Sequence, residues 1–172
     1  MKHCAPLLVL LIASVIACLP SQAAEPAFRF DGQDFFLKAN EGGIKEYLPA
    51  GETFEDWTTL MSVRGFRNIA DPQAYALRVV ENARKSGPAG QGQVIRNDKG
   101  DTYIADFLVF PPQGAPRNFA EWNLMRVRKS GEGIEVLQYA RRFYDFDESA
   151  AATIRAERNK IVPRLAAFEI PE

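Results

Sequence analysis

Three long strands are predicted by one stretch of the chain, residues 102–144, which reads TYIADFLVFPPQGAPRNFAEWNLMRVRKSGEGIEVLQYARRFY. Apolar and aromatic residues fill three segments of this stretch, and turns rich in proline or glycine separate them. The expected strands cover residues 102–110, 119–129 and 134–144. Because short connections join antiparallel neighbours, we expect consecutive strands of this group to pair in opposite directions.

Two helices and several shorter strands are expected in the rest of the chain. A helix is predicted over residues 71–86, because Asp71 suits the N-cap, Pro72 suits the first helical position and an apolar stripe follows. A second apolar stripe predicts a helix over about 147–162, and Pro163 is expected to kink or re-cap its last turns. The remaining strands are expected at residues 28–30, 35–39, 44–48, 57–66 and 94–96.

These elements predict an α+β fold, in which a mostly antiparallel sheet packs against two main helices. Of the 172 residues, 47% are hydrophobic and 25% are charged, which is typical of a globular protein. We expect residues 24–172 to form one domain, since that length is enough for a single substantial core.

The first 23 residues have the pattern of a secretory signal peptide. Lys2 precedes an apolar run, and the small residues Ser21 and Ala23 flank Gln22 ahead of a cleavage point. The run is short for a membrane span. We therefore expect export, cleavage after Ala23, and a periplasmic or secreted mature chain with no transmembrane segment. The alternative is a lipoprotein anchored through Cys18, because residues 15–18 also fit a loose lipobox.

The two residue types with special chemistry, cysteine and histidine, lie only in this leader. Cys4, Cys18 and His3 are the only cysteines and the only histidine of the chain. Residues 24–172 can therefore form no disulfide, no serine or cysteine nucleophile activated by histidine, and no zinc site of histidine and cysteine. We expect no metal, no cofactor and no catalytic residue of these kinds. The net charge of −1 offers no basic excess for nucleic acid, which we do not expect as a partner.

Polar side chains inside the three long strands are the candidate binding residues. Asp106 has apolar neighbours and shares a strand face with Ile104 and Leu108. Because the register is not determined by the sequence, Asp106 could meet several polar residues of the next two strands in one patch. Arginines there would bind an anion through two parallel hydrogen bonds, and one of them would pair with Asp106. The candidates are Asp106, Glu121, Asn123, Arg126, Gln138, Arg141 and Arg142, with Arg126, Arg141 and Arg142 as the possible partners of Asp106.

Several segments resemble those of uncharacterised secreted proteins of Gram-negative bacteria. They are residues 46–53 (EYLPAGET) with Trp57 and Thr58, residues 71–76 (DPQAYA), residues 106–108 (DFL), Arg126 and residues 139–142 (YARR). The resemblance covers most of residues 24–172 and implies no activity. The order of elements is also similar to the PsbP-like α/β sandwich, a fold of accessory proteins in export compartments. That similarity concerns the fold and does not determine a function.

Two functions are compatible with these patterns. The sequence favours an exported, non-catalytic protein of the bacterial envelope that binds a partner protein or a small anionic ligand. The alternative is a hydrolase of envelope glycans that uses Asp106 and Glu121, since two carboxylates about 5–10 Å apart in an open cleft can cleave glycosidic bonds. A third interpretation is structural, because buried charges are usually paired with one another.

Overall fold

The computed structural model describes residues 25–85, 91–111, 114, 119–144 and 146–171. The expected signal peptide, residues 1–23, lies outside this part. The described elements are β1 (Phe28–Phe30), β2 (Gln33–Glu41), β3 (Ile44–Pro49), β4 (Thr59–Phe66), α1 (Pro72–Lys85), β5 (Gln91–Arg96), β6 (Thr102–Val109), β7 (Phe119–Ser130), β8 (Gly133–Tyr144) and α2 (Glu148–Ala167).

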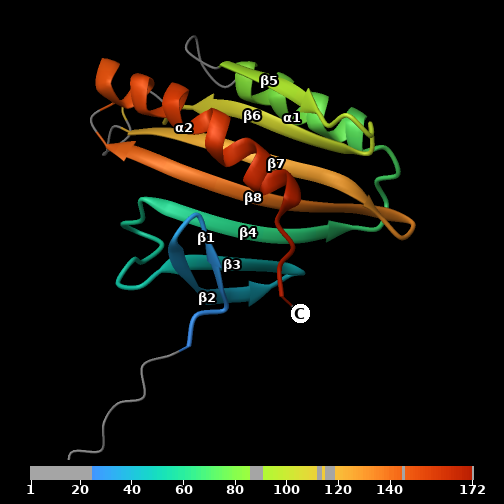
Figure 1. The fold of residues 1–172 in the computed structure, drawn as a ribbon, viewed down its shortest axis with the longest axis horizontal. Helices are drawn as coiled ribbons and strands as arrows, with labels where there is room; N and C mark the ends of the chain where they lie inside the picture. Colours follow the sequence, from blue (N-terminus) through green and yellow to red (C-terminus); the bar gives the residue numbers. More distant parts are fainter. Residues whose placement is uncertain (1–24, 86–90, 112–113, 115–118, 145, 172) are drawn as a thin grey trace, which may run out of the picture.

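The strands form one sheet in the order β1-β2-β3-β4-β8-β7-β6-β5 (Figure 1). Every neighbouring pair is antiparallel. Two runs of consecutive strands, β1–β4 and β5–β8, are joined where β4 pairs with β8, from Thr59 opposite Arg141 to Phe66 opposite Ile134. The predicted α+β class, with an antiparallel sheet and two helices, is therefore confirmed.

The order of the elements agrees with the sequence prediction, and the differences lie at their ends. β5 begins at Gln91 instead of residue 94, and α2 continues through Pro163 to Ala167 instead of ending near residue 162. Leu165 is fully buried beyond the proline. Packing of this last turn on the sheet outweighs the hydrogen bond that a proline removes from a helix.

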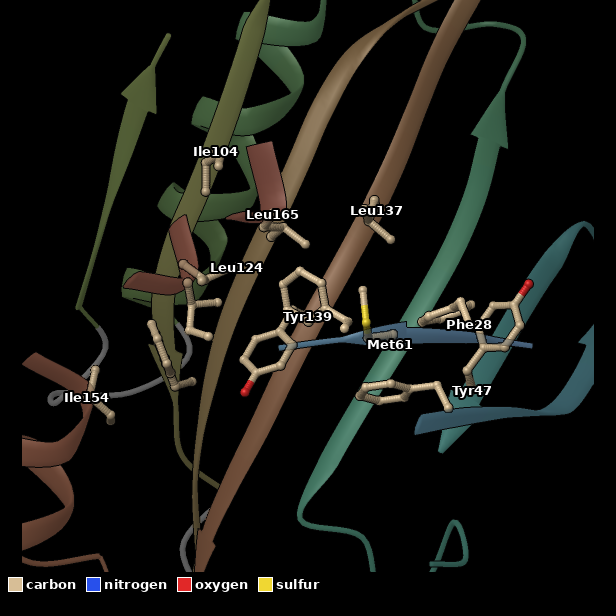
Figure 2. Packing of buried hydrophobic residues seen from close by; sticks show 13 residues of the cluster. Phe28, Tyr47, Met61, Ile104, Leu124, Leu137, Tyr139, Ile154 and Leu165 are labelled. Carbon is tan, nitrogen blue, oxygen red and sulfur yellow. The ribbon is translucent and has the colours of Figure 1, made fainter. Parts of the chain in front are cut away.

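The two helices cover opposite faces of the sheet. On the α1 face, the small residues Ala76 and Ala83 pack against β6 and β7, and α1 comes so close to β5 that a Cβ added to Gly92 would lie 3.0 Å from Val80 Cγ1. On the α2 face, larger side chains such as Trp122 separate the helix from the strands. Figure 2 shows this second core, which contains Leu165 and Ile154 of α2 together with Leu124 and Tyr139 of the strands.

The hairpin of β1 and β2 is attached to α2 at its turn. Asp31 adopts a positive φ of 47°. Its carboxylate accepts a hydrogen bond from Lys160 Nζ at 3.0 Å and another from Arg164 Nη1. Phe30 packs against Phe168, just beyond α2, with ring centroids 5.0 Å apart. The N-terminal and C-terminal ends of the domain thus stabilise each other. In the described part of the chain, neither helix is long and apolar enough to cross a membrane.

Tyr139 should make the folded protein less stable at alkaline pH. Its ring lies between Phe30 and Trp122, and only 6% of the residue is exposed. Burial raises the pKa of Tyr139 to about 12 from an ordinary value of 10.0. The unfolded chain loses this proton first, so folding stability should fall as the pH rises from about 10 to 12, by up to about 3 kcal/mol.

Denaturant unfolding across this pH range, in the parent and in Tyr139→Phe, tests the prediction. The parent should lose more stability than the variant, which has no phenol to ionise at this position. An equal loss in both proteins would contradict the assignment to Tyr139.

Candidate functional site

The sequence-predicted residues divide between the two faces of the sheet. Asp106 lies opposite Leu124 in the ladder of β6 and β7, whereas Glu121 lies opposite Val109. Side chains of adjacent strands that lie opposite each other share a face. Asp106, Arg126 and Arg141 therefore belong to the α2 face, and the α1 face carries Glu121, Asn123, Gln138 and Arg142. The expectation of one patch that combines Asp106 with residues such as Glu121 is wrong.

Asp106 is held by three side chains in a fully buried position. Its Oδ2 lies 2.6 Å from Nε of Arg158 and accepts a hydrogen bond from Gln93 Nε2 at 2.9 Å. Its Oδ1 accepts a hydrogen bond from Trp122 Nε1 at 2.8 Å and lies 3.5 Å from Nη2 of Arg158. Both carboxylate oxygens are thus engaged. The side chain of Asp106 is 0% exposed, so its charge depends on this pairing.

The arginine that pairs with Asp106 comes from α2 and not from the strands. Sequence reasoning considered only Arg126, Arg141 and Arg142 and missed Arg158. A signal was nevertheless present, because Arg158 stands four residues after Ile154 and three before Ile161, on the apolar stripe of the helix. A cation on a buried stripe indicates an acidic partner in the layer beneath it.

Arg126 holds the C-terminal end of α2 and is almost completely buried. Its Nη1 donates to the backbone carbonyl of Phe168 and lies 3.5 Å from that of Leu165, while its Nη2 donates to Glu135 Oε1 at 3.0 Å. Burial is the main cause that lowers the pKa of Arg126, with repulsion from Arg128 second. A guanidinium at this position satisfies carbonyls that a helix end leaves free.

Arg141 forms a further link between the sheet and α2. It pairs with Glu157 of the helix, and its guanidinium lies 4.9 Å from the ring centroid of Phe143. Arg126, Arg141 and Asp106 therefore all fix the position of α2 on the sheet. Each of these three side chains forms its ion pair with a residue of the same chain.

On the α1 face, the predicted residues form a chain of hydrogen bonds. Gln138 accepts from Ser62 at 3.1 Å and donates to Asn123 Oδ1 at 2.7 Å, and Asn123 donates to Glu121 Oε1 at 3.2 Å. Glu121 also pairs with Arg142, with 3.1 Å between its Oε2 and Nε of the arginine. Because the polar groups satisfy one another, this chain stabilises the sheet and leaves few donors for a ligand.

Arg142 ends this chain between two aromatic rings. Its guanidinium carbon lies 3.9 Å from the ring centroid of Trp57 and 4.6 Å from that of Phe119. Such stacking adds a cation–π attraction to the ion pair with Glu121. Arg142 thereby attaches the segment before β4, which contains Trp57, to the strands β7 and β8.

The carboxylates of the hydrolase alternative do not face each other. Asp106 lies on the α2 face and Glu121 on the α1 face, so the sheet itself separates them. Each is also paired with an arginine, Arg158 and Arg142 respectively. The pair therefore cannot flank one glycosidic bond in a shared cleft. Within the described ranges, no three His, Cys, Asp or Glu residues are grouped so that they could hold a metal ion.

A cavity between α2 and the end of β6, which we call the α2 cavity, is the best candidate for a binding site. Its volume is about 360 Å³. A smaller cavity of about 240 Å³, lined in part by Asp106, adjoins it, and the two share Gln91, Leu108 and Arg158. The α2 cavity is lined by Gln91, Leu108, Phe110, Phe146, Ala151, Ile154, Arg155 and Arg158.

The walls of the α2 cavity combine apolar surface with two cations. Phe110 and Phe146 meet edge to face with their centroids 5.5 Å apart. Arg155 and Arg158 lie one turn apart on α2 and supply the charge. None of the seven sequence-predicted binding residues lines this cavity. Of the seven, only Asp106 lines the smaller cavity beside it. These lining residues are suited to an anion that also has an apolar part.

The fold and the site thus define a class, the α+β proteins in which an antiparallel sheet lies between two helices and leaves a cavity beneath one of them. A family of bacterial proteins without a characterised function matches residues 22–170, and the chain belongs to this family. The resemblance to uncharacterised bacterial proteins is thereby confirmed. Comparison with curated proteins finds no match.

Solved structures with a similar arrangement have very different sequences. The Ran-binding protein Mog1p of Saccharomyces cerevisiae matches with a TM-score of 0.50 and 9% identity, over 76% of this chain and 84% of Mog1p. A mutant of Mog1 matches over the same shares at 10% identity and the same TM-score. A STAR-related lipid transfer protein from Xanthomonas axonopodis has 12% identity over 77% of this chain and 97% of its own, with a TM-score of 0.34. The likeness to Mog1 concerns the fold alone.

Proposed function

We propose that this protein binds a small anionic ligand in the α2 cavity without transforming it. The observation that carries the proposal is Arg155, which lines the cavity and has no ion-pair or hydrogen-bond partner among the described residues. Most of the other arginines on the α2 face are paired within the chain. A guanidinium without a partner beside apolar walls provides both charge and contact area for a small molecule.

Filling the α2 cavity should abolish binding. Ala151 lines the cavity, so Ala151→Phe would place a phenyl ring inside it, whereas the exposed neighbour Ala152 is not among the lining residues and gives the matched control Ala152→Phe. Native mass spectrometry of protein isolated gently from its host should show a small-molecule adduct on the parent and on Ala152→Phe. Ala151→Phe should lack the adduct.

Other outcomes of this measurement would contradict the proposal. An adduct that persists in Ala151→Phe would locate the ligand elsewhere. If a protein is bound in a one-to-one ratio instead of a small molecule, the result would favour binding of a partner protein, which is the other function that the sequence allows. The description of Mog1p as Ran-binding names a role of this kind.

The proposal extends to the place where the protein acts, the bacterial envelope. The pattern of residues 1–23 supports export and removal of this segment, and the lipobox at Cys18 supports the alternative of a lipid anchor. The similarity of element order to the PsbP-like sandwich, a fold of exported accessory proteins, stays a prediction. Intact-mass measurement of the protein from its host should give a chain that begins at Ala24. A lipidated N-terminal Cys18, or retention of residues 1–17, would overturn this part.

A further inference from the structure

We infer that the ligand of the α2 cavity is an amphiphile with a single negative charge, such as a monocarboxylate with an apolar chain. This inference rests on the proposed function and specifies the chemical class of its ligand. It follows from the charge balance of the lining and from its combination of cations with apolar side chains.

Arg158 contributes donors to the cavity but no net charge. Its Nε lies 2.6 Å from Oδ2 of Asp106, and its Nη2 donates to Oδ1 at 3.5 Å. Asp106 is in turn fixed by Trp122 and Gln93. The Nη1 group of Arg158 has no partner among the described residues, so it can donate to a ligand while the ion pair stays intact.

Arg155 contributes one uncompensated positive charge. It is exposed, lies three residues before Arg158 on α2, and has no acidic partner in the described chain. Among the described residues that line the α2 cavity, none is an Asp or a Glu. Because Asp106 of the adjoining cavity neutralises Arg158, the described lining residues and Asp106 together carry a net charge of +1, which one negative charge on a ligand neutralises. A dianion would retain an uncompensated charge beside apolar walls, which is unfavourable.

The apolar side chains of the α2 cavity lie beside these cations, and Gln91 is the single neutral polar residue among the described residues that line it. Leu108 lines it from β6, Phe110 from just beyond that strand, Phe146 from the segment before α2, and Ile154 from the helix itself. Burial of an apolar chain against these residues contributes about 25 cal/mol for each Å² removed from water. A small hydrophilic anion would leave this surface unused. The ligand thus needs both a charged head and an apolar chain.

Isothermal titration calorimetry with decanoate tests the ligand class. Saturable binding of one decanoate per protein is expected, with affinity at least about tenfold higher than for decylamine, decanol or acetate, because each lacks one of the two features. Decyl phosphate, measured at about pH 8 where its second proton has dissociated, should also bind more weakly. Equal binding of the amine or the alcohol, or tighter binding of the phosphate, would overturn the inference.

Variants connect the binding to the residues named. Arg155→Gln should weaken decanoate binding by about tenfold or more, because it removes a charge-assisted hydrogen bond. The matched control is Arg78→Gln, an exposed arginine of α1 on the opposite face of the sheet, which should bind decanoate like the parent. Unchanged affinity in Arg155→Gln would refute the role of Arg155.

The two proposals fail in different ways. If decanoate does not bind but Ala151→Phe still removes a native adduct, the ligand class is wrong and the binding function stands. If Ala151→Phe leaves the native adduct in place, the proposed function fails, and with it the assignment of this ligand class to the α2 cavity.

Discussion

Asp106→Ala is expected to lower the free energy of unfolding by about 3–5 kcal/mol, because its buried carboxylate accepts several hydrogen bonds and each bond to a charged group contributes about 1.5–3 kcal/mol. The substitution removes the acceptor of Trp122 and of Gln93 and leaves Arg158 without its counter-charge. The indole N–H of Trp122 suffers most, because this residue is fully buried and water cannot replace the lost acceptor. Denaturant unfolding of the parent and the variant measures the effect.

Two further variants separate the ion pair from general damage to the sheet. Asp98→Ala removes an exposed carboxylate in the turn before β6 and should change stability by no more than about 0.5 kcal/mol. The double variant Asp106→Ala with Arg158→Ala should cost less than the sum of the two single variants, because the second substitution removes a charge already unpaired. Additive costs would show that Arg158 and Asp106 do not stabilise each other.

Arg126→Met is expected to be the second most destabilising of these substitutions, with a loss of about 3 kcal/mol. Methionine retains much of the apolar stem but removes the donor of the Phe168 carbonyl, and the Leu165 carbonyl keeps only the backbone N–H of Phe168. Glu135 keeps its bond to Arg128 at 3.0 Å, so its charge stays paired. The loss should therefore appear mainly at the C-terminal end of α2. Amide hydrogen exchange there should accelerate more than in α1.

Arg128→Met serves as the control for Arg126. Arg128 binds Glu135 and Glu169 but is 32% exposed, so water can replace its partners. Its loss should cost about 1 kcal/mol or less, as for other exposed pairs. If Arg128→Met were as destabilising as Arg126→Met, the capping of α2 by Arg126 would not be the source of the effect.

The fold was largely predictable because its signals are local. The alternation of apolar residues and the turns around residues 111–114 and 130–133 identify the long strands, and the caps and stripes identify both helices. The ends of elements were less accurate where packing acts on them. α2 passes Pro163 because Leu165 gains a buried position, and β5 begins early because Gln91 pairs with Leu108.

The candidate site was predictable only in part, because it depends on which strands and helices meet. Alternation alone places Asp106 on one strand face with Ile104 and Leu108, and its apolar neighbours predict its burial. Its partner Arg158 is 52 residues further along the chain. The α2 cavity likewise joins residues of β5, β6 and α2 that no motif connects.

The linear order of residues is enough to establish the α+β class, which residues share a strand face, and the absence of histidine and cysteine chemistry after residue 23, because these depend on composition and short-range periodicity. The tertiary structure was needed to show that Asp106 and Glu121 lie on opposite faces, that Arg158 neutralises Asp106 and that Arg155 lines a cavity. Strand register and helix docking decide these relations. Both arise from contacts between distant segments, whose free energies are set by how the side chains pack and not by their neighbours in sequence.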